Sequence, residues 1–424
     1  MTVHPGNWLW PILERPPYAG AAVSARKLRV LVVDHVTKVM GGAEVNLVEL
    51  LDHPGVRETW DTGVACRTGS PLHQALETIG CVRHDYGFGA SLNELRVVGR
   101  GFSPAAKWRG WQEVQRARRC LESLIRKVQP DVILSCTNKD HFTAGGAARR
   151  CGVPSVWWVN DILSADFFSW PVRKVFVHQA RRLASTLAPV ANFGRDALIR
   201  EGVPETRITT VHNGISLAKY VRDPSRPLRQ ELGLKPGEPL FGILGRITPW
   251  KGQDRFVDLA AAWKASGRPG SFAIIGRAFN EDQLFDQGLR LCVEERGLGD
   301  VLRFVPFQAG VASVLSSLDV LIHTSVKPEP FGRVLIEAMA VGTPVLAARA
   351  GGVPEIVEEG VNGEMAASGD LDEYRSKLDR MIQPEVLAEL SRRARPTVEA
   401  KFSLDRVAAD FTRIFTAVAG QKRS

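Results

Sequence analysis

Short apolar, β-branched runs alternate with longer helical patterns along this chain, and this alternation restricts its fold more than any other feature. It is typical of βαβ units, in which helices connect parallel strands. The runs form two series, so we expect two doubly wound α/β domains. Strands are predicted at 29–33, 62–66, 131–136, 155–159 and 187–191 in the first series, and at 240–244, 272–275, 302–305, 320–323 and 344–347 in the second.

The length of the chain agrees with two domains, because 424 residues are too many for one hydrophobic core. Helices are predicted at 43–51, 112–128, 252–265 and 309–318, and a last one after Phe402-Ser403. The turn Asn213-Gly214 marks the passage between the two series. We therefore expect an N-terminal extension at 1–27, a first domain at 28–211, a second domain at 212–403 and a C-terminal helix at 404–424.

The apolar segments are too short to cross a bilayer, since none approaches the ~20 apolar residues that a spanning helix needs. The short run at 8–13 is interrupted by Pro11 and has no basic stretch before it, so no secretory signal is predicted. The six cysteines show no metal-like spacing and indicate small buried side chains in a reducing compartment. These features predict a cytoplasmic protein.

The net charge of +9 is concentrated in the first half of the chain. Residues 1–226 hold 30 Lys and Arg against 20 Asp and Glu, whereas the remaining residues hold 25 against 26. Six of these cations share one stretch with Trp108 and Trp111, namely Arg109, Arg116, Arg118, Arg119, Arg126 and Lys127. No nucleic-acid motif accompanies them, so nucleic acid is not expected as a partner. An anionic membrane surface or a lipid-linked acceptor fits such a patch, and a solvated basic face explains it equally well.

The stretch EPFGRVLIEAMA at 329–340 places two carboxylates eight residues apart around a Pro-Phe-Gly turn. Glu329 is expected in a loop and Glu337 on the first turns of a helix. The free N–H groups at a helix start, with the helix dipole behind them, bind anions, and carboxylates accept hydrogen bonds from hydroxyls. The stretch therefore suits a ligand that is part sugar and part phosphate. A plain alternative is an exposed ion pair between Arg333 and Glu337, which are spaced i,i+4.

Two further loops at strand ends carry groups that could bind a diphosphate. Arg246 and Lys251 lie five residues apart after the predicted strand at 240–244. Gly41 and Gly42 follow the first strand and precede an amphipathic helix, so a ligand could approach the backbone there. Solvated loop cations and an ordinary tight turn are the alternatives.

The string Asp370-Leu371-Asp372 looks like a metal-binding D-x-D, but Glu373 follows Asp370 by three residues, as in a helix-capping box. We therefore predict a helix start there and no metal ion. His35, His178 and His323 stand alone in the sequence, and we interpret them as structural or peripheral.

Taken together, the motifs resemble those of the retaining, nucleotide-sugar-dependent glycosyltransferases of family 4, which carry an E-x7-E signature. The strongest matches are GGAE at 41–44, G-R-x-x-x-x-K-G at 245–252 and E-x7-E at 329–337, with weaker ones at 211–214, 274–277 and 351–355. They cover most of residues 29–405. The resemblance implies the GT-B fold, in which two Rossmann-like domains face each other across a cleft and a C-terminal helix crosses back to the first domain.

The resemblance also implies a role for each matching residue. Glu329 would contact the donor sugar and Glu337 the ribose of the nucleotide, while Arg246 and Lys251 would neutralise the leaving diphosphate. The other donor-binding positions that it implies lie in glycine-rich or helix-start loops: Gly41, Gly42, Gly276, Arg277, Phe331, Gly332 and Arg333.

The chain departs from the family at Asn160, where many members have a histidine that faces the donor sugar. A side-chain amide can still hydrogen-bond a sugar hydroxyl, so Asn160 stays among the candidate catalytic residues. A phosphate oxygen is expected to take the acceptor's proton. No dedicated general base and no cofactor are therefore expected.

The predicted function is metal-independent, retaining transfer of a sugar from a nucleoside diphosphate to a hydroxyl acceptor, whether glycan, glycolipid or small molecule. A nucleotide-sugar epimerase or hydrolase of the same fold is one alternative, and a catalytically degenerate protein that binds nucleotide sugar is another. The expected partners are the donor, the acceptor and an anionic membrane, whose inner surface the basic first domain would touch.

Overall fold

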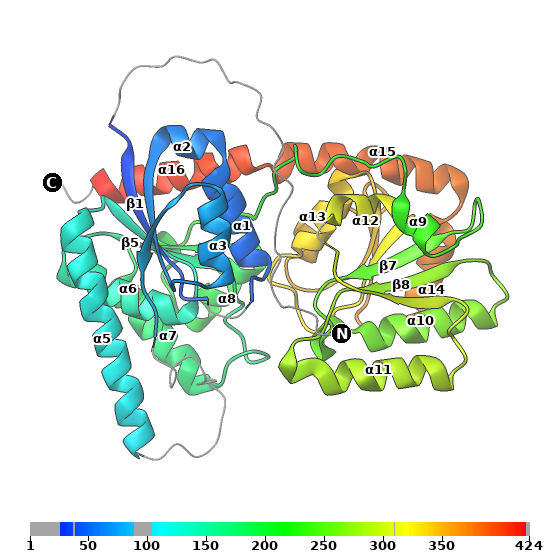
Figure 1. Cartoon of the computed structure of the whole chain (residues 1–424), viewed down its shortest axis with the longest axis horizontal. Helices are drawn as coiled ribbons and strands as arrows, with labels where there is room; N and C mark the ends of the chain where they lie inside the picture. The colour runs from blue at the N-terminus through cyan, green and yellow to red at the C-terminus, as the bar shows by residue number, and fades with distance from the viewer. Residues whose placement is uncertain (1–25, 37–38, 89–103, 309, 421–424) are drawn as a thin grey trace. The chain divides into compact units, whose positions relative to one another are not determined.

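The computed structural model describes residues 26–36, 39–88, 104–308 and 310–420 (Figure 1). The predicted extension at 1–27 therefore lies almost entirely outside the described residues, as do Ala309 and the last four residues of the predicted C-terminal helix. The chain divides into two compact units. The first unit contains the residues up to Val156 together with those from Thr412 onward, and the second unit contains Trp157–Phe411.

Two six-stranded sheets share one strand order. The first sheet has the order β3-β2-β1-β4-β5-β6 and the second β12-β11-β10-β7-β8-β9, so in each the order reverses beside the first strand. Neighbouring strands pair in parallel, as β1 does with β2 and β4, and β7 with β8 and β10. The first sheet contains β1 (Leu28–Val33), β2 (Trp60–Cys66), β3 (Val82–Asp85), β4 (Val132–Ser135), β5 (Ser155–Val159) and β6 (Thr186–Pro189). The second contains β7 (Leu240–Leu244), β8 (Ser271–Ile275), β9 (Leu302–Val305), β10 (Val320–His323), β11 (Val345–Ala348) and β12 (Gly363–Ala366).

The helices of the first unit cover both faces of β1, β2 and β4. They are α1 (Gly42–Asp52), α2 (Pro54–Thr59), α3 (Pro71–Thr78), α5 (Pro104–Val128) and α6 (Asn138–Arg150). α5 lies alongside α6 (Figure 1), and its buried side chains at Ala117, Leu121 and Ile125 pack with apolar residues of the strands. This four-residue spacing places one stripe of α5 in the core and leaves the opposite stripe outside.

The second unit has the same layered construction. Its helices are α7 (Trp170–Leu183), α8 (Asn192–Glu201), α9 (Pro227–Glu231), α10 (Gln253–Ala265), α11 (Gln283–Glu295), α12 (Val311–Ser317), α13 (Arg333–Ala340), α14 (Leu371–Met381) and α15 (Pro384–Lys401). Figure 1 shows α12 and α13 on one face of the second sheet and α10 and α11 on the other. Phe241, Phe256, Trp263 and Phe272 fill the core between β7, β8 and α10.

The last helix, α16 (Leu404–Gly420), has residues in both units. In the second unit, Phe411 packs edge-on against Trp158 with ring centroids 5.0 Å apart. In the first unit, the indole N–H of Trp60 donates to the Thr412 hydroxyl at 2.9 Å, and its ring packs against Phe415 at 4.9 Å. The predicted return of the C-terminal helix to the first domain is confirmed.

All ten predicted strands are present, and their ends lie within two residues of the predicted ones. Two edge strands, β3 and β12, were not predicted. The α/β fold with two doubly wound sheets is confirmed. No helix in the described part of the chain is long and apolar enough to span a membrane. The prediction of buried cysteines holds only for Cys66 and Cys136, because Cys81, Cys151 and Cys292 are half-buried and Cys120 is exposed on α5.

Candidate functional site

The carboxyl ends of β10, β7 and β8 lie side by side in the second sheet, and the loops that follow these strands carry many of the predicted site residues. Arg246 and Lys251 follow β7, Gly276 and Arg277 follow β8, and Glu329 follows β10. The strand order reverses between β7 and β10. Ligands of open α/β sheets bind at such a point, outside the carboxyl ends of the strands.

Lys251 and Glu329 form an ion pair at this edge. The Lys251 ammonium lies 2.9 Å from Oε1 and 2.8 Å from Oε2 of Glu329, and it also packs over the Trp250 ring, 4.3 Å from its centroid. Burial alone would raise the pKa of the Glu329 carboxyl, but Lys251 and His323 together hold that pKa well below its usual range. Glu329 is therefore charged at neutral pH although it is only 9% exposed.

His323 and Ser325 complete the surroundings of Glu329. His323 Nε2 lies 3.2 Å from Glu329 Oε2, and the Ser325 hydroxyl lies 3.2 Å from the same oxygen and 3.0 Å from His323 Nε2. His323 stands alone in the sequence, but it contacts a candidate site residue in the structure and is therefore not peripheral. A usable signal was its place at the end of β10, six residues before Glu329.

Two glycines let the backbones of these loops meet. Gly252 has φ of 72°, and a Cβ there would lie 2.1 Å from the Thr324 carbonyl oxygen. Gly351 has φ of 66° and forms a β-bridge with Glu329, whose carbonyl oxygen would lie 2.1 Å from a Cβ at 351. Only glycine tolerates both the left-handed backbone and the close approach. These two positions therefore fix where Lys251 and Glu329 stand.

Arg246 is held by acidic residues of the loop after β8. Its guanidinium donates to Asp282 at 2.9 Å through Nε and to Glu281 at 2.6 Å through Nη2, and it packs over the Phe279 ring at 5.1 Å. Its side chain is 38% exposed. In the described residues its hydrogen bonds run to this loop and not to Glu329, so the structure does not join the two predicted diphosphate cations in one cluster. No sequence motif indicated Asp282 or Glu281.

The two predicted residues after β8 are engaged in local contacts. The Gly276 N–H donates to the Val305 carbonyl at 3.0 Å and so belongs to the edge of the sheet. Arg277 packs over the Phe279 ring, 5.4 Å from its centroid. Phe279 thus lies against two cations, Arg246 and Arg277.

Helix α13 carries Glu337 and Arg333, which form the i,i+4 ion pair of the plain alternative. Arg333 Nε lies 2.7 Å from Glu337 Oε1, and the Tyr220 hydroxyl donates to the same oxygen at 2.9 Å. The pair is not exposed as that alternative supposed, since its side chains are 10% and 11% accessible. Tyr220 lies more than a hundred residues before Glu337 in the sequence, and no motif indicated that it would contact this residue.

The backbone before α13 offers two hydrogen-bond donors. The N–H groups of Phe331 and Gly332 donate to no other residue that the structure describes. They precede the helix at its positive end. The Phe331 side chain is buried, with its ring 5.6 Å from that of Phe402. Two N–H groups therefore lie in the same loop as the Glu329 carboxylate, where a phosphate or sugar oxygen could accept from them.

The remaining predicted residues lie at the ends of strands of the first sheet. Asn160 follows β5 and donates its side-chain amide to the Trp158 carbonyl at 3.2 Å. Gly41 precedes α1, and its N–H donates to the Glu44 carboxylate at 2.6 Å, so this amide is satisfied within the capping box. Gly42 is the first residue of α1.

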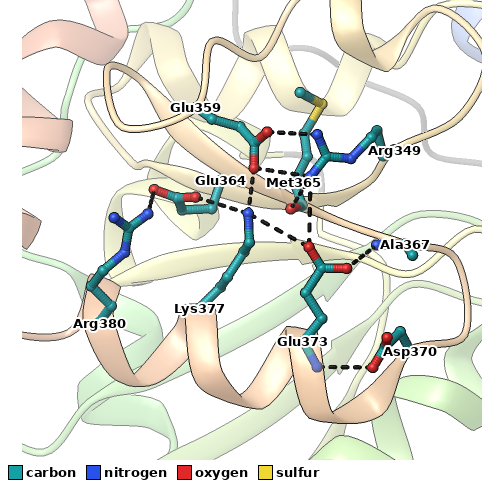
Figure 2. Close-up of polar contacts among 9 residues, drawn as sticks. All are labelled: Arg349, Glu359, Glu364, Met365, Ala367, Asp370, Glu373, Lys377 and Arg380. Carbon is teal, nitrogen blue, oxygen red and sulfur yellow. Dashed lines mark hydrogen bonds and ion pairs between the residues drawn. The ribbon is translucent and has the colours of Figure 1, made fainter.

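The D-x-D string starts a helix, as predicted. Asp370 Oδ1 accepts the Glu373 N–H at 2.9 Å and caps α14 (Figure 2). The reciprocal bond of a full capping box is not formed, because the Glu373 carboxylate accepts the N–H of Ala367 instead, at 2.7 Å. Asp372 points to solvent with a side chain that is 85% exposed.

Two family models match the chain. The model of "Glycosyl transferases group 1" matches residues 225–399, and that of "Glycosyltransferase Family 4" matches residues 40–219. Together they cover both series of strands. The chain belongs to the group 1, family 4 glycosyltransferases.

Several curated relatives of the chain carry the name D-inositol 3-phosphate glycosyltransferase. The chain is 33% identical over 278 residues to the enzyme of this name from Gordonia bronchialis. The aligned residues make up 61% of this chain and 60% of the relative. It is 31% identical over 226 residues to the enzyme of the same name from Mycobacterium marinum, and the aligned residues make up 51% of this chain and 47% of the relative. The chain thus spans about half to three fifths of the length of the curated relatives it matches.

Solved structures match this glycosyltransferase-family chain over more of its length. Anabaena HepE, in complex with UDP and glucose, superposes with a TM-score of 0.78 and 25% identity, covering 92% of this chain and all of HepE. Sucrose-phosphate synthase from Thermosynechococcus elongatus superposes with a TM-score of 0.75 and 18% identity, covering 93% of this chain and all of that one. The predicted two-domain GT-B fold is confirmed.

Proposed function

We propose that this protein transfers a sugar from a nucleoside diphosphate to a hydroxyl acceptor with retention of anomeric configuration. The observation that carries the proposal is the Lys251–Glu329 ion pair in the same loop region as the N–H groups of Phe331 and Gly332. A cation and two N–H donors suit a diphosphate, and the carboxylate suits a sugar hydroxyl. The complexes of HepE with UDP and with UDP-glucose support a UDP-sugar as the donor.

Donor binding would redistribute the contacts of Lys251. The ammonium would leave Glu329 for a phosphate oxygen, while His323 and Ser325 stay on the carboxylate and keep it oriented toward the sugar. Arg246 would likewise exchange Asp282 and Glu281 for the diphosphate. As the bond between the anomeric carbon and the diphosphate oxygen breaks, its electrons stay on that oxygen and the diphosphate leaves. The acceptor hydroxyl oxygen forms the new bond to the anomeric carbon on the same face, and a phosphate oxygen takes the hydroxyl proton. Two cations would supply the charge that a metal ion supplies in other transferases.

The other end of the donor would lie at α13. Arg333 and Tyr220 fix one oxygen of Glu337, and a fixed carboxylate is suited to a pair of ribose hydroxyls. The name of the curated relatives, D-inositol 3-phosphate glycosyltransferase, supports a cyclic polyol as the acceptor class.

A panel of nucleotide sugars, screened by thermal unfolding, tests the donor assignment first. A specific donor raises stability by RT ln(1 + [L]/Kd), and we expect a UDP-sugar to give the largest shift. That donor is then incubated with D-inositol 3-phosphate, and the anomeric configuration of the product is read by NMR. An inverted product would contradict retention. Water as the sole acceptor would indicate a hydrolase, and binding without turnover would indicate a degenerate protein.

A further inference from the structure

A second group of polar, titratable side chains lies in the first unit, at the carboxyl ends of β1 and β4. His35 follows β1, and Thr137 and Asp140 lie where β4 leads into α6. Tyr86 follows β3. His35 stands alone in the sequence, but in the structure its ring pairs with Asp140.

The Asp140 carboxylate is buried, with no exposed surface, and both of its oxygens accept hydrogen bonds. Oδ2 accepts the His35 backbone N–H at 3.0 Å and the Thr137 hydroxyl at 2.7 Å, and lies 2.8 Å from His35 Nδ1. Oδ1 accepts the Tyr86 hydroxyl at 3.0 Å. A carboxylate so placed selects the ring tautomer that carries its proton on Nδ1. The other ring nitrogen, Nε2, is then a hydrogen-bond acceptor.

His35 Nε2 is open to a ligand. In the described part of the chain this nitrogen has no hydrogen-bond partner, and it is not among the buried polar atoms. The His35 side chain is 13% exposed, and the Phe88 ring packs edge-on against it at 4.9 Å. The imidazole is therefore held in place on one side and presents a single lone pair on the other.

The charges around the ring indicate what it would bind. Asp34 and Glu44 are also buried. Burial, with help from Glu44 and Asp140, raises the pKa of the Asp34 carboxyl well above its usual range. Burial and Asp140 also raise the pKa of Tyr86. Lys139 is the cation that interacts with Asp140. The Asp140 carboxylate at the ring and the lone pair on Nε2 both disfavour an anion there, whereas the positive end of an O–H dipole is favoured.

We propose that His35 and Asp140 form a binding site for a neutral hydroxyl of the acceptor polyol. Nε2 accepts the hydrogen bond of that hydroxyl, and Asp140 positions the ring. This assignment rests on the proposed glycosyl transfer.

Steady-state kinetics with a UDP-sugar donor and D-inositol 3-phosphate as the acceptor test the site. His35→Ala should raise the acceptor KM roughly 5- to 10-fold, the effect of one lost hydrogen bond, while calorimetric affinity for UDP stays unchanged. His35→Gln, whose amide oxygen can accept the same bond, should recover much of the loss. The matched control is His178→Ala, an exposed histidine on α7. An unchanged acceptor KM in His35→Ala would overturn the proposal.

The tautomer of His35 gives a second test that needs no turnover. Nitrogen NMR of the imidazoles, assigned by comparison with His35→Gln, should show Nδ1 protonated in His35, and Nε2 should shift when myo-inositol is added. A proton on Nε2, or no shift at saturating myo-inositol, would overturn the hydroxyl site. If the protein transfers sugar to no polyol, the proposed function fails by itself, and this spectrum still decides whether the hydroxyl site exists.

Discussion

At the scale of single residues, Lys251 and Arg246 differ in how deeply their carboxylate partners are buried. Without Lys251, the Glu329 charge remains almost buried, with His323 and Ser325 as its neighbours. Without Arg246, Asp282 and Glu281 lose a partner at a site where Glu281 is 43% exposed. Removing one partner of a buried ion pair destabilises the folded protein far more than removing one partner of an exposed pair.

We therefore expect Lys251→Ala and Arg246→Ala to lower kcat/KM to a similar extent. We expect Lys251→Ala to lower the free energy of unfolding more than Arg246→Ala does. Each loses a charge-assisted contact to the diphosphate worth ~1.5–3 kcal/mol, which is roughly a 10- to 150-fold loss in kcat/KM. Urea unfolding should show a loss of about 2–4 kcal/mol for Lys251→Ala and at most about 1 kcal/mol for Arg246→Ala. Unchanged kinetics in both variants would show that Lys251 and Arg246 do not bind the diphosphate.

The two glutamates should separate turnover from nucleotide binding. A carboxylate that aligns the reacting sugar acts mostly in the transition state, so Glu329→Gln should lower kcat and keep near-normal UDP affinity. A carboxylate on the ribose acts in ground and transition states alike, so Glu337→Gln should raise the donor KM with kcat largely intact. Calorimetry with UDP and steady-state kinetics measure both effects, and the reverse pattern would mean that the roles are exchanged.

The motif residues could be predicted from sequence because their types and spacing are local. Their partners could not. Tyr220 reaches Glu337 across 117 residues, and Asp282 reaches Arg246 across 36, so both contacts depend on how separate loops come together. His323 was within reach of prediction, since the end of a parallel strand beside a candidate site is a strong position for a functional side chain.

At the scale of elements, the missed strands are those with no apolar run. β3 reads VRHD and has no fully buried residue, and β12 begins with Gly363, where a Cβ would lie 2.5 Å from the Val345 carbonyl oxygen. Edge strands have one neighbour and are often short and polar. Interior strands such as β7, which is largely buried, have the continuous apolar pattern that predicts them.

A cluster of charges connects α14 to β12 and the loop before it (Figure 2). Glu359 pairs with Arg349 at 2.6 Å and with Lys377, while Glu364, whose side chain is 1% exposed, pairs with Lys377 at 3.3 Å and with Arg380. The hydrogen bond from Lys377 has the largest effect on Glu359, and together with Arg349 it lowers the pKa of this carboxyl to about 2 against the opposing effect of burial.

The low pKa of Glu359 predicts a pH-dependent contribution to stability. Its pKa in the unfolded chain is about 4.3, so the contribution is fully present above that pH and is lost as pH falls toward the folded-state pKa of about 2. Glu359→Gln should cost at most about 1 kcal/mol near neutral pH, since the side chain is partly exposed. The difference from wild type should vanish toward pH 2 in urea unfolding. Glu58→Gln, at an exposed acid without an ion pair in the described structure, is the control.

Helix α5 gives the basic patch a definite surface. Trp108 and Trp111 are 58% and 53% exposed and stack with centroids 5.0 Å apart. From residue 108 to 127 the exposed side chains include five cations and no acid: Arg109, Arg116, Arg119, Arg126 and Lys127. Indole rings favour the membrane interface, and cations favour anionic headgroups. We propose that this face contacts an anionic membrane.

Vesicle co-sedimentation tests this surface. Binding should be stronger to anionic than to neutral vesicles and should weaken as salt rises, because exposed charges are screened over ~8–10 Å. The double variants Trp108→Ser/Trp111→Ser and Arg116→Gln/Arg119→Gln should each lose most of the binding. Leu284→Ser/Leu291→Ser, an exposed apolar pair on α11, is the matched control. Equal sedimentation with both vesicle types would leave α5 as a solvated basic helix.

At the scale of the whole molecule, the two sheets repeat one strand order, and each places polar loops at the carboxyl ends of its central strands. This much could be predicted, because the alternation of strand and helix patterns runs through the entire chain. The pairing of His35 with Asp140 could not be predicted, since the two residues are 105 positions apart and neither lies in the motifs matched in the sequence.

Activity of the whole enzyme should survive the removal of divalent metal. Lys251, Arg246 and the N–H groups before α13 would supply the positive charge at the diphosphate. In the described structure the Asp370 carboxylate is used to cap α14 and Asp372 points to solvent. Dialysis against a chelator, followed by the transfer assay, measures this. Complete loss of activity that Mn²⁺ or Mg²⁺ restores would contradict the metal-free mechanism.

The close backbone approach at Gly252 and Gly351 also limits how donor choice can diversify in evolution or in a mutant library. Every other amino acid at these positions would push the Thr324 or Glu329 carbonyl aside, and with it the pairing of Lys251 and Glu329. A change in donor selectivity must therefore come from substitutions at residues next to Gly252 and Gly351, while the two glycines remain constant. A saturation library should be directed to those neighbouring positions.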